Sequence, residues 1–243
     1  MSPAGVHHFF VPPADLRDGT VVIKGAEAHH AARVLRVRAG EAISVADGTG
    51  RVVEAVVREV GETVVADVTG ATVVERPVPA LTLCQAVPKG DRMDGVVAKA
   101  VEIGVARVVP FLAERSIVRW DATKRRRARE RWAALARSAA KQARSPHLTE
   151  IDEVVEGLPT GMGGTVVALH EGASTRLREA LPAEPPVALT VVVGPEGGLT
   201  PAEVDRLRAD GSALVTLGGR ILRSDTAGLV AATIVGHTYG TLG

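Results

Sequence analysis

Aromatic residues are scarce in this sequence. Its 243 residues include three Phe, two Trp and one Tyr, although 46% of the chain is hydrophobic. Any core must therefore be built mainly from Val, Leu, Ile and Ala. A nucleic-acid site in this protein cannot depend on many aromatic side chains that stack on bases.

Cysteine, long apolar runs and net charge are also nearly absent. Cys84 is the single cysteine, which excludes an intrachain disulfide and a thiolate-rich metal site. The histidines show no zinc-like spacing, so we expect no metal. No stretch reaches the roughly 18 apolar residues of a membrane span, and the first residues do not read as a secretory signal. These absences predict a cytoplasmic protein without a membrane partner.

The pattern of the chain changes near residue 76. Before it, short β-rich runs alternate with turn residues around one helical segment, residues 26–37, which is typical of a small β-barrel. Pro77 and Pro79 then indicate a stiff linker. After it, apolar strands alternate with helices, which predicts an α/β domain with a parallel sheet covered on both faces. We therefore predict two domains, residues 1–76 and 77–243.

One glycine-rich loop follows an apolar strand in the second domain. The segment VVVGPEGGLT at 191–200 passes from strand to loop, and Thr200, Pro201 and Glu203 then form a capping box that begins a helix. Ligands of open α/β sheets bind beyond the carboxyl ends of the strands. A lone loop of this kind is more often an ordinary tight turn. It matches neither the Walker phosphate loop nor the dinucleotide fingerprint.

A second glycine-containing loop lies about twenty residues further on. The segment LGGRILRSDTA at 217–227 again ends a strand and begins a helix, and Ser224 and Asp225 are ordinary capping residues. Arg223 is not explained by capping, because a cation is mildly unfavourable at the positive end of a helix. It is either a solvated side chain or a cation held to meet negative charge. We expect the two loops to lie at neighbouring strand ends.

Basic residues cluster locally although the net charge is only +1. Between residues 124 and 144, nine Lys or Arg accompany one acid, Glu130. A solvated helix face is the usual explanation for such a run, but the local excess favours contact with phosphates. The candidate RNA-binding residues are Arg33 and Arg36 in the first domain and Lys89, Arg92, Arg115, Lys141 and Arg144 in the second.

These motifs, taken in order, resemble a known family. GPEGGLT at 194–200 and LGGRILRSDTA at 217–227 carry the resemblance, with AVPKGDRMDGVVAKAVEIGV at 86–105, PFLAERSIVRW at 110–120 and HHAARVLRVRAGE at 29–41. Together they are similar to ribosomal RNA small subunit methyltransferase E, a family of the SPOUT superfamily that methylates N3 of a uridine in 16S ribosomal RNA.

The resemblance implies a fold, a cofactor and partners. The fold would be a PUA-like β-barrel followed by a SPOUT domain with a deep trefoil knot. The cofactor would be S-adenosyl-L-methionine, and the partners would be 16S rRNA in the small ribosomal subunit and a second copy of the chain, paired through the knot region. The methyl-donor pocket would contain Leu169, His170, Gly194, Pro195, Glu196, Gly197, Gly198, Leu217, Gly218, Ile221, Leu222 and Ala227.

The resemblance also implies a direct displacement without a covalent enzyme intermediate. Arg223 is the candidate catalytic residue, because it could stabilise the negative charge of the uridine ring. Glu196 and Asp225 are candidate general bases by loop position alone. Cys84 lies in an apolar strand and is more typical of core than of a nucleophile.

The sequence departs from the family pattern at several places. His8 stands where Arg is usual, which affects the expected RNA contact of the first strand, and Lys141 makes a segment more basic than in many relatives. Two other functions remain open. One is a related SPOUT methyltransferase that acts on another rRNA or tRNA position or on a ribose 2′-hydroxyl. The other is a non-catalytic RNA-binding factor in ribosome assembly.

Overall fold

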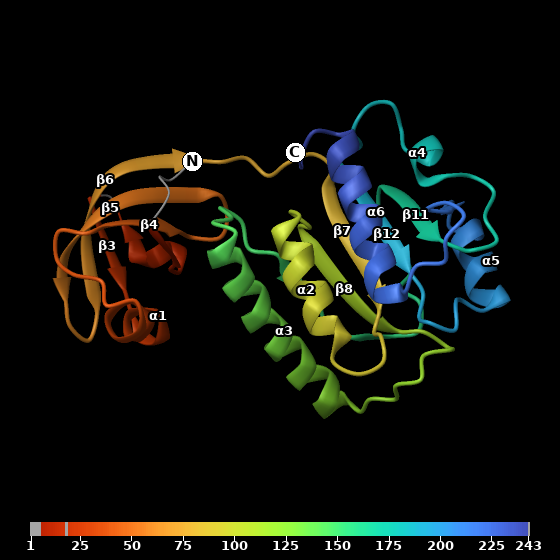
Figure 1. Ribbon diagram of the computed structural model, residues 1–243, viewed down its shortest axis with the longest axis horizontal. Coiled ribbons are helices and arrows are strands. Elements are labelled where there is room, and N and C mark those ends of the chain that lie inside the picture. Colours follow the sequence, from red (N-terminus) through yellow and green to blue (C-terminus); the bar gives the residue numbers. More distant parts are fainter. Residues whose placement is uncertain (1–5, 18, 243) are drawn as a thin grey trace. The chain divides into compact units, whose positions relative to one another are not determined.

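The computed structural model describes residues 6–17 and 19–242. These residues form two compact units, each described here by itself (Figure 1). Unit 1 comprises the described residues up to Arg76 together with Ala140–Leu148, and unit 2 comprises the remainder from Pro77 onward. The short segment 140–148, which the sequence places in the second domain, is thus part of unit 1.

Unit 1 is built on a six-stranded sheet in the order β1-β4-β5-β6-β3-β2. β1 and β4 pair in parallel, and the other neighbours are antiparallel. Its core is aliphatic except for Phe9, as the composition predicts. The strands are β1 (His7–Phe10), β2 (Leu16–Arg17), β3 (Thr20–Ile23), β4 (Ala42–Ala46), β5 (Arg51–Val60) and β6 (Val64–Val73).

The helical segment of unit 1 is shorter and less regular than expected. After the short 3₁₀ turn η1 (Pro13–Asp15), α1 (Gly25–His29) continues in a single π-helical stretch, η2 (His30–Val34). Arg36 follows at φ 55°, a left-handed conformation that ends the helical segment before Val37. The expected helix over 26–37 was therefore too long.

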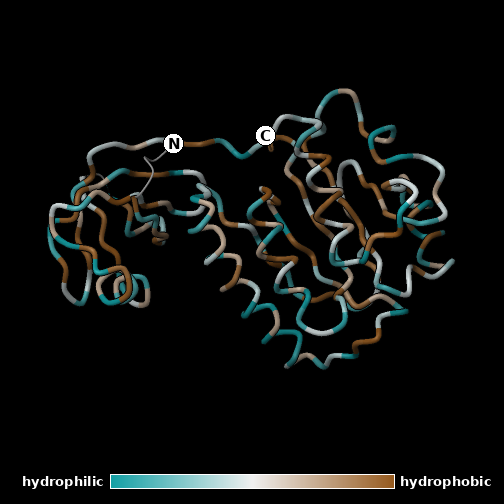
Figure 2. The backbone as a smooth tube through the Cα atoms, viewed as in Figure 1, coloured by the Kyte–Doolittle hydropathy of each residue, from teal (hydrophilic) through white to brown (hydrophobic). Residues whose placement is uncertain are grey.

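Unit 2 is an α/β unit built on an all-parallel sheet in the order β10-β8-β7-β12-β11-β13, with β9 also paired to β8. Its central strands are buried apolar runs, as expected when helices cover both faces (Figure 2). The strands are β7 (Ala80–Ala86), β8 (Arg107–Leu112), β9 (Glu150–Ile151), β10 (Val155–Glu156), β11 (Thr165–Leu169), β12 (Ala188–Val193) and β13 (Ala213–Val215).

Helices α2 and α6 lie side by side, and α6 covers β7 and β12 (Figure 1). Trp132 on α3 is fully buried, and its indole Nε1 donates a hydrogen bond to Asp94 of α2 at 2.9 Å. The parallel sheet confirms the predicted α/β class of the second domain. The helices are α2 (Arg92–Glu102), α3 (Ala122–Gln142), α4 (Leu177–Ala180), α5 (Pro201–Ala209) and α6 (Ser224–Thr238).

Candidate active site

Four strands of unit 2 end level with one another. In the register of the sheet, Gln85 of β7 lies opposite Val193 of β12, Val193 opposite Leu169 of β11, and Leu169 opposite Val215 of β13. The loops that follow these strands therefore start from one edge of the sheet. β11 separates β12 from β13, so the expectation that the two glycine loops follow neighbouring strands was wrong, although both loops start from this edge.

Buried side chains fix the first loop, residues 194–200. The predicted capping box is present: Thr200 Oγ1 accepts from the Glu203 amide at 3.2 Å, and Glu203 Oε2 accepts from the Thr200 amide at 2.8 Å. Glu203 is only 1% exposed, and its other oxygen accepts from the Glu114 amide at 3.1 Å. Glu203 thus joins the loop after β12 to the loop after β8.

Arg115 also holds the first loop. Its guanidinium donates to the carbonyl oxygens of Gly197 at 3.2 Å and Leu199 at 3.4 Å. Both acceptors are neutral, so the positive charge of Arg115 is not cancelled by them. Arg115 can therefore position the loop and still attract an anion.

A second set of buried contacts joins three segments of the edge. Gln85 is fully buried, and its Nε2 donates to Ser224 Oγ at 3.0 Å. Ser224 Oγ in turn donates to the carbonyl of Gly194 at 2.7 Å. A Cβ at Gly228 would lie 2.8 Å from Gln85 Oε1, so a glycine is needed where α6 crosses this side chain. The two glycine loops are thus connected through the end of β7.

The surfaces around these loops are partly apolar and open. Leu169, Leu217, Leu222 and Ala227 are half-buried, and Ile221 is 86% exposed. Gly218 has a φ of 123°, and a Cβ there would meet no atom within 4 Å. Backbone groups and apolar side chains are therefore accessible together, which is the usual composition of a small-molecule site. His170, at the end of β11, accepts at Nδ1 from the Gly172 amide at 3.1 Å.

Charged groups gather at the start of α6. Arg92 of α2 lies between two carboxylates, with Nη1 3.6 Å from Glu196 Oε1 and Nε 3.9 Å from Asp225 Oδ2. Glu196 Oε1 also accepts from the Lys89 amide at 3.2 Å. Among the described residues, the buried Asp225 Oδ1 has no hydrogen-bond partner. A cavity of about 500 Å³ lies beside Arg92 and Asp225, between α2 and α6.

Arg223 occupies the N-cap position of α6. Its carbonyl accepts from the amides of Thr226 and Ala227 at 2.9 and 2.8 Å, whereas its side chain is exposed. Within the part of the chain that the structure describes, its guanidinium forms no ion pair. The backbone of Arg223 thus starts the helix, and its charge remains available at the same edge as the two glycine loops.

The structure distributes the predicted RNA-binding residues over both units. Arg33, Arg36, Lys141 and Arg144 belong to unit 1, where the first two and Arg144 are exposed. Lys141 is ion-paired with Glu27 at 3.0 Å, and both side chains are largely buried. Arg36 and Arg144 adopt φ values of 55° and 50°, which are costly for residues other than glycine and often mark functional positions.

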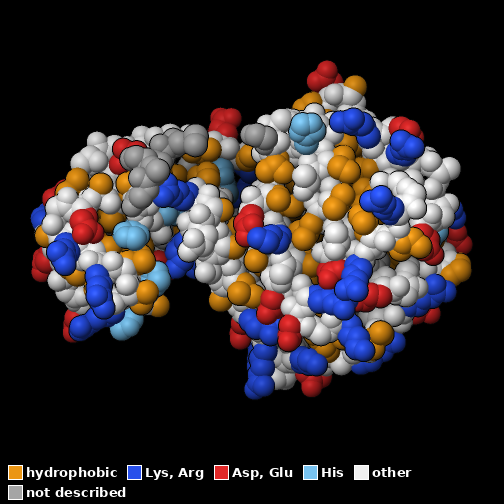
Figure 3. All heavy atoms as spheres, in the orientation of Figure 1, with side chains coloured by type: hydrophobic (Ala, Val, Ile, Leu, Met, Phe, Trp, Pro, Cys, Tyr) orange, Lys and Arg blue, Asp and Glu red, His pale blue; other side chains and the backbone are white. Residues whose placement is uncertain are grey.

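Acidic residues accompany much of the basic run on α3. Arg125, Arg129 and Arg131 pair with Glu156, Glu153 and Asp94 at 3.3, 3.6 and 2.7 Å. On the face seen in Figure 3, Lys and Arg side chains of unit 2 are interspersed with Asp and Glu. The count of charges between residues 124 and 144 could not reveal these ion pairs, because the acids lie on other segments. α3 therefore presents less net positive charge than its own residues suggest.

His8, where the family resemblance leads us to expect Arg, is buried in β1. Its Nδ1 lies 3.0 Å from Ser44 Oγ, and the side chain is 8% exposed. Burial lowers the pKa of His8, and Arg144 lowers it further against opposing effects of Ser145 and Glu27. A side chain buried in this way is not placed to contact an RNA phosphate.

The sequence prediction missed the residues that hold the loops, namely Gln85, Glu114, Ser224 and Glu203 in this role. Gln85 carried the clearest signal, because it is a polar residue inside the apolar run LTLCQA. Ser224 and Glu203 were interpreted as ordinary capping residues, and sequence spacing cannot show that their side chains reach other loops. Cys84 is fully buried in β7, and burial raises its thiol pKa, as fits a core residue.

Comparisons with known proteins agree with this arrangement. An RNA methyltransferase domain matches residues 74–236, and an RNA methyltransferase PUA domain matches residues 23–65. The fold and the site thus define an RNA methyltransferase with a PUA domain. Within the described residues, no helix is long and apolar enough to cross a membrane, and no three His, Cys, Asp or Glu form a group suited to a metal ion.

Individual relatives narrow the class. Ribosomal RNA small subunit methyltransferase E of Mycobacterium bovis is 34% identical, covering 94% of this chain and 90% of the relative. The Bacillus subtilis protein of that name is 32% identical, with 90% of each covered. The Neisseria gonorrhoeae protein of that name, solved with bound S-adenosyl methionine, superimposes with a TM-score of 0.84 at 29% identity, covering 96% of this chain and 98% of that one. The chain belongs to the ribosomal RNA small subunit methyltransferase E family.

Proposed function

We propose that this protein transfers a methyl group from S-adenosylmethionine to N3 of a uridine in the 16S rRNA of the small ribosomal subunit. The observation that carries the proposal is the level row of strand ends in β7, β12, β11 and β13, with both glycine loops tied together through Gln85 and Ser224. The solved Neisseria relative with its bound methyl donor supports the choice of cofactor.

The residues at this edge fit the donor. The open backbone at Gly218 and the accessible apolar side chains of Leu217 and Leu222 suit the nucleoside part of such a molecule. The loop 194–198 and the end of β11 at Leu169 and His170 would complete the pocket. Bound S-adenosylmethionine would supply an electrophilic methyl group on a sulfonium, and the walls of the pocket would exclude water from it.

Two side chains at the start of α6 would assist the transfer. Methylation forms a bond from N3 to the methyl carbon, breaks the carbon–sulfur bond and releases the N3 proton. Asp225 would accept that proton, because its Oδ1 is buried and has no hydrogen-bond partner among the described residues. Arg223 would stabilise the negative charge that spreads onto the two uracil carbonyl oxygens. Arg92 would hold Asp225 and Glu196 in place.

A homodimer through the knot region is part of this proposal. α6 contains no Lys or Arg, and Leu229, Val230 and Ile234 on it are only half-buried. Figure 3 shows hydrophobic side chains on the surface over α6. A second copy would cover this surface, and light scattering of the purified protein should give twice the mass of one chain.

The substrate is tested by product analysis. The purified chain is incubated with isotope-labelled donor and small ribosomal subunits that lack the modification, and the labelled nucleoside is identified by mass spectrometry. Label in N3-methyluridine from 16S rRNA supports the proposal. Label in a ribose-methylated nucleoside or in tRNA would identify a related SPOUT activity, and absence of donor binding would favour an assembly factor.

The role of Arg223 is tested by separating binding from chemistry. Arg223→Ala should lower the single-turnover rate by about 100-fold while the Kd for the donor, measured by calorimetry, changes less than threefold. Arg208→Ala is the matched control, because Arg208 is an exposed arginine on α5 whose one ion pair among the described residues is with Asp205 in the same helix. Equal losses of rate and donor affinity would assign Arg223 to donor binding instead.

A further inference from the structure

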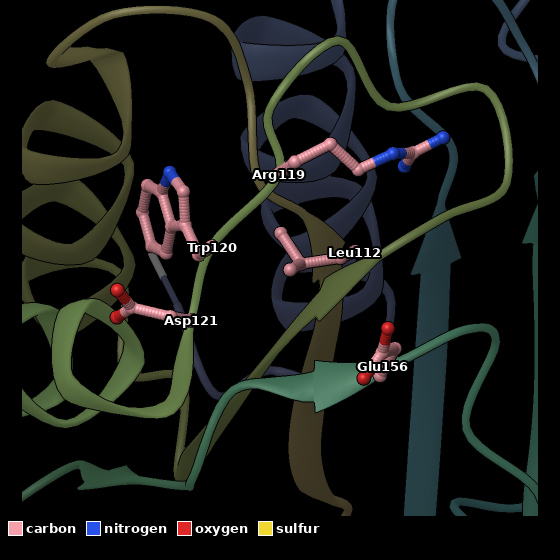
Figure 4. A pocket seen from close by; sticks show the side chains of 5 residues that line it. All are labelled: Leu112, Arg119, Trp120, Asp121 and Glu156. Atoms are coloured by element: carbon pink, nitrogen blue, oxygen red, sulfur yellow. The ribbon is translucent and has the colours of Figure 1, made fainter.

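A small cavity lies at the same edge of the sheet, where β8 and β10 end. It measures about 280 Å³ and is lined by Leu112 of β8, Glu156 of β10, and Arg119, Trp120 and Asp121 of the segment before α3. Leu112 and Glu156 are paired in the register of the sheet. Figure 4 shows Leu112 between the Trp120 indole on one side and the Arg119 and Glu156 side chains on the other.

Trp120 gives this cavity an aromatic wall. It is one of two tryptophans in the chain; the other, Trp132, is fully buried, whereas Trp120 is half-buried. The two ring centroids lie 5.9 Å apart at an interplanar angle of 34°, so Trp132 supports Trp120 from inside the unit. An indole supported in this way stays in position while part of its surface faces solvent.

One cation contacts the indole, and two more lie on nearby residues of the chain. The Lys124 ammonium lies 5.1 Å from the Trp120 ring centroid, and Arg119 donates to the carbonyl of Glu114 at 3.2 Å, which leaves its charge uncancelled. Arg127, one turn along α3, is exposed. Lys and Arg beside an aromatic ring are the usual elements of a site that binds single-stranded nucleic acid, because the cations bind phosphates and the ring stacks on a base.

The two acids of the cavity have different roles. Asp121 Oδ1 is engaged in the chain itself, since it accepts from the Lys124 amide at 2.7 Å at the start of α3. The Glu156 side chain is 82% exposed and meets Arg125 at 3.3 Å. Glu156 can therefore accept a hydrogen bond from an amino or imino group on the edge of a base.

We infer that this cavity binds one unpaired nucleobase of the RNA, stacked on Trp120, with its neighbouring phosphates on Arg119 and Lys124. The inference rests on the proposed RNA substrate and adds a second contact, separate from the methylated uridine. The exposed Lys124 side chain would move from the ring to a phosphate as the base enters. In a chain with so few aromatic residues, Trp120 is the position best suited to stacking.

Tryptophan fluorescence tests the stacking directly. Because Trp132 is fully buried, quenching of the full chain by an unmodified single-stranded RNA 12-mer should report on Trp120. We expect saturable quenching of the unaltered chain and none with Trp120→Leu. Quenching that persists in Trp120→Leu would overturn the inference.

Turnover on small ribosomal subunits provides the second readout. Trp120→Leu should raise KM about tenfold while kcat and the Kd for the donor stay within twofold, and Trp120→Phe should recover most of the loss because a ring can still stack. Arg119→Gln should raise KM severalfold, whereas Arg107→Gln, at the opposite end of β8, should not. A wild-type KM in Trp120→Leu, or a loss of donor binding in both Trp120 variants, would overturn the site.

The two proposals fail in different ways. If the unaltered chain methylates a nucleoside other than uridine at N3, the proposed function is wrong, but quenching that depends on Trp120 would still support the stacking site. If N3-methyluridine is formed and RNA does not quench Trp120, the proposed function stands and this inference fails.

Discussion

The two glycine loops of unit 2 and the exposed arginines of unit 1 are built in opposite ways. The loops are held by side chains that are almost fully buried: Gln85 donates to Ser224, Ser224 donates to the Gly194 carbonyl, and Glu203 accepts from the Thr200 amide. The basic surface of unit 1 consists of the exposed Arg33, Arg36 and Arg144, and Arg36 and Arg144 have a positive φ. The first region is held by buried hydrogen bonds, whereas the second consists of charged side chains that face solvent.

Because the glycine loops depend on buried hydrogen bonds, we expect the largest effect from Gln85→Leu, which should weaken binding of the methyl donor. The substitution removes the donor that joins β7 to Ser224 and leaves buried acceptors without a partner, at a cost of about 2 kcal/mol. We expect the Kd for the donor to rise roughly 30-fold, as measured by calorimetry. Ser212→Ala is the control, because this buried hydroxyl has no hydrogen-bond partner among the described residues. A donor affinity unchanged by Gln85→Leu would show that the loops hold their shape without this connection.

Glu203→Gln should have the second-largest effect, which we expect on the free energy of unfolding. An amide can replace one carboxylate oxygen as acceptor but not both, so the variant loses a charge-assisted bond to either the Thr200 or the Glu114 amide. The free energy of unfolding in urea should fall by about 2 kcal/mol. Asp205→Asn on the same helix changes an exposed carboxylate and should have almost no effect. Equal effects of the two variants would contradict the assigned role of Glu203.

Arg36→Gly should weaken the binding of RNA without lowering the free energy of unfolding. Glycine adopts the φ of 55° at little cost, so the unfolding free energy should stay the same or rise by about 1 kcal/mol. RNA affinity should fall severalfold with the lost charge, in a filter-binding assay at several salt concentrations. Arg38→Gly removes the same charge at a residue outside the left-handed region, so it should lower the free energy of unfolding. If Arg36→Gly lowers the free energy of unfolding as much as Arg38→Gly does, the backbone at Arg36 is not strained.

The smallest effect that we predict is a pH dependence of the free energy of unfolding, caused by two histidines of unit 1. Burial lowers the pKa of His8 and of His147 below the ordinary value of 6.5, so the unfolded chain binds these protons more readily. Their contribution to stability is therefore fully present above pH 6.5 and is lost as the pH falls toward the lowered values. A double substitution, His8→Gln with His147→Gln, should flatten the urea stability profile between pH 7 and 5. An unchanged slope would mean that neither imidazole is held neutral by the fold.

The sequence predicted the parts of the fold that follow from local patterns. Apolar runs such as 187–193 gave the buried strands, and Thr200 with Glu203 gave the capping box and the start of α5. The family resemblance then supplied the cofactor. These predictions succeeded because each depends on neighbouring residues or on a motif.

Contacts between distant segments could not be predicted in the same way. The connection from Gln85 to Ser224 spans 139 positions, and the pairing of α3 with Glu153 and Glu156 depends on how strands return to the sheet. The order of the strands likewise places β11 between the two glycine loops. Such features depend on topology, which short-range patterns do not encode.

Hydrogen exchange with and without S-adenosylmethionine tests the central claim most directly. We predict that the donor slows exchange at 169–172, 194–199 and 217–223, which follow β11, β12 and β13, and leaves exchange at 33–38 in unit 1 unchanged. Protection confined to other segments, or to only one of the two glycine loops, would contradict a donor site formed by this row of strand ends.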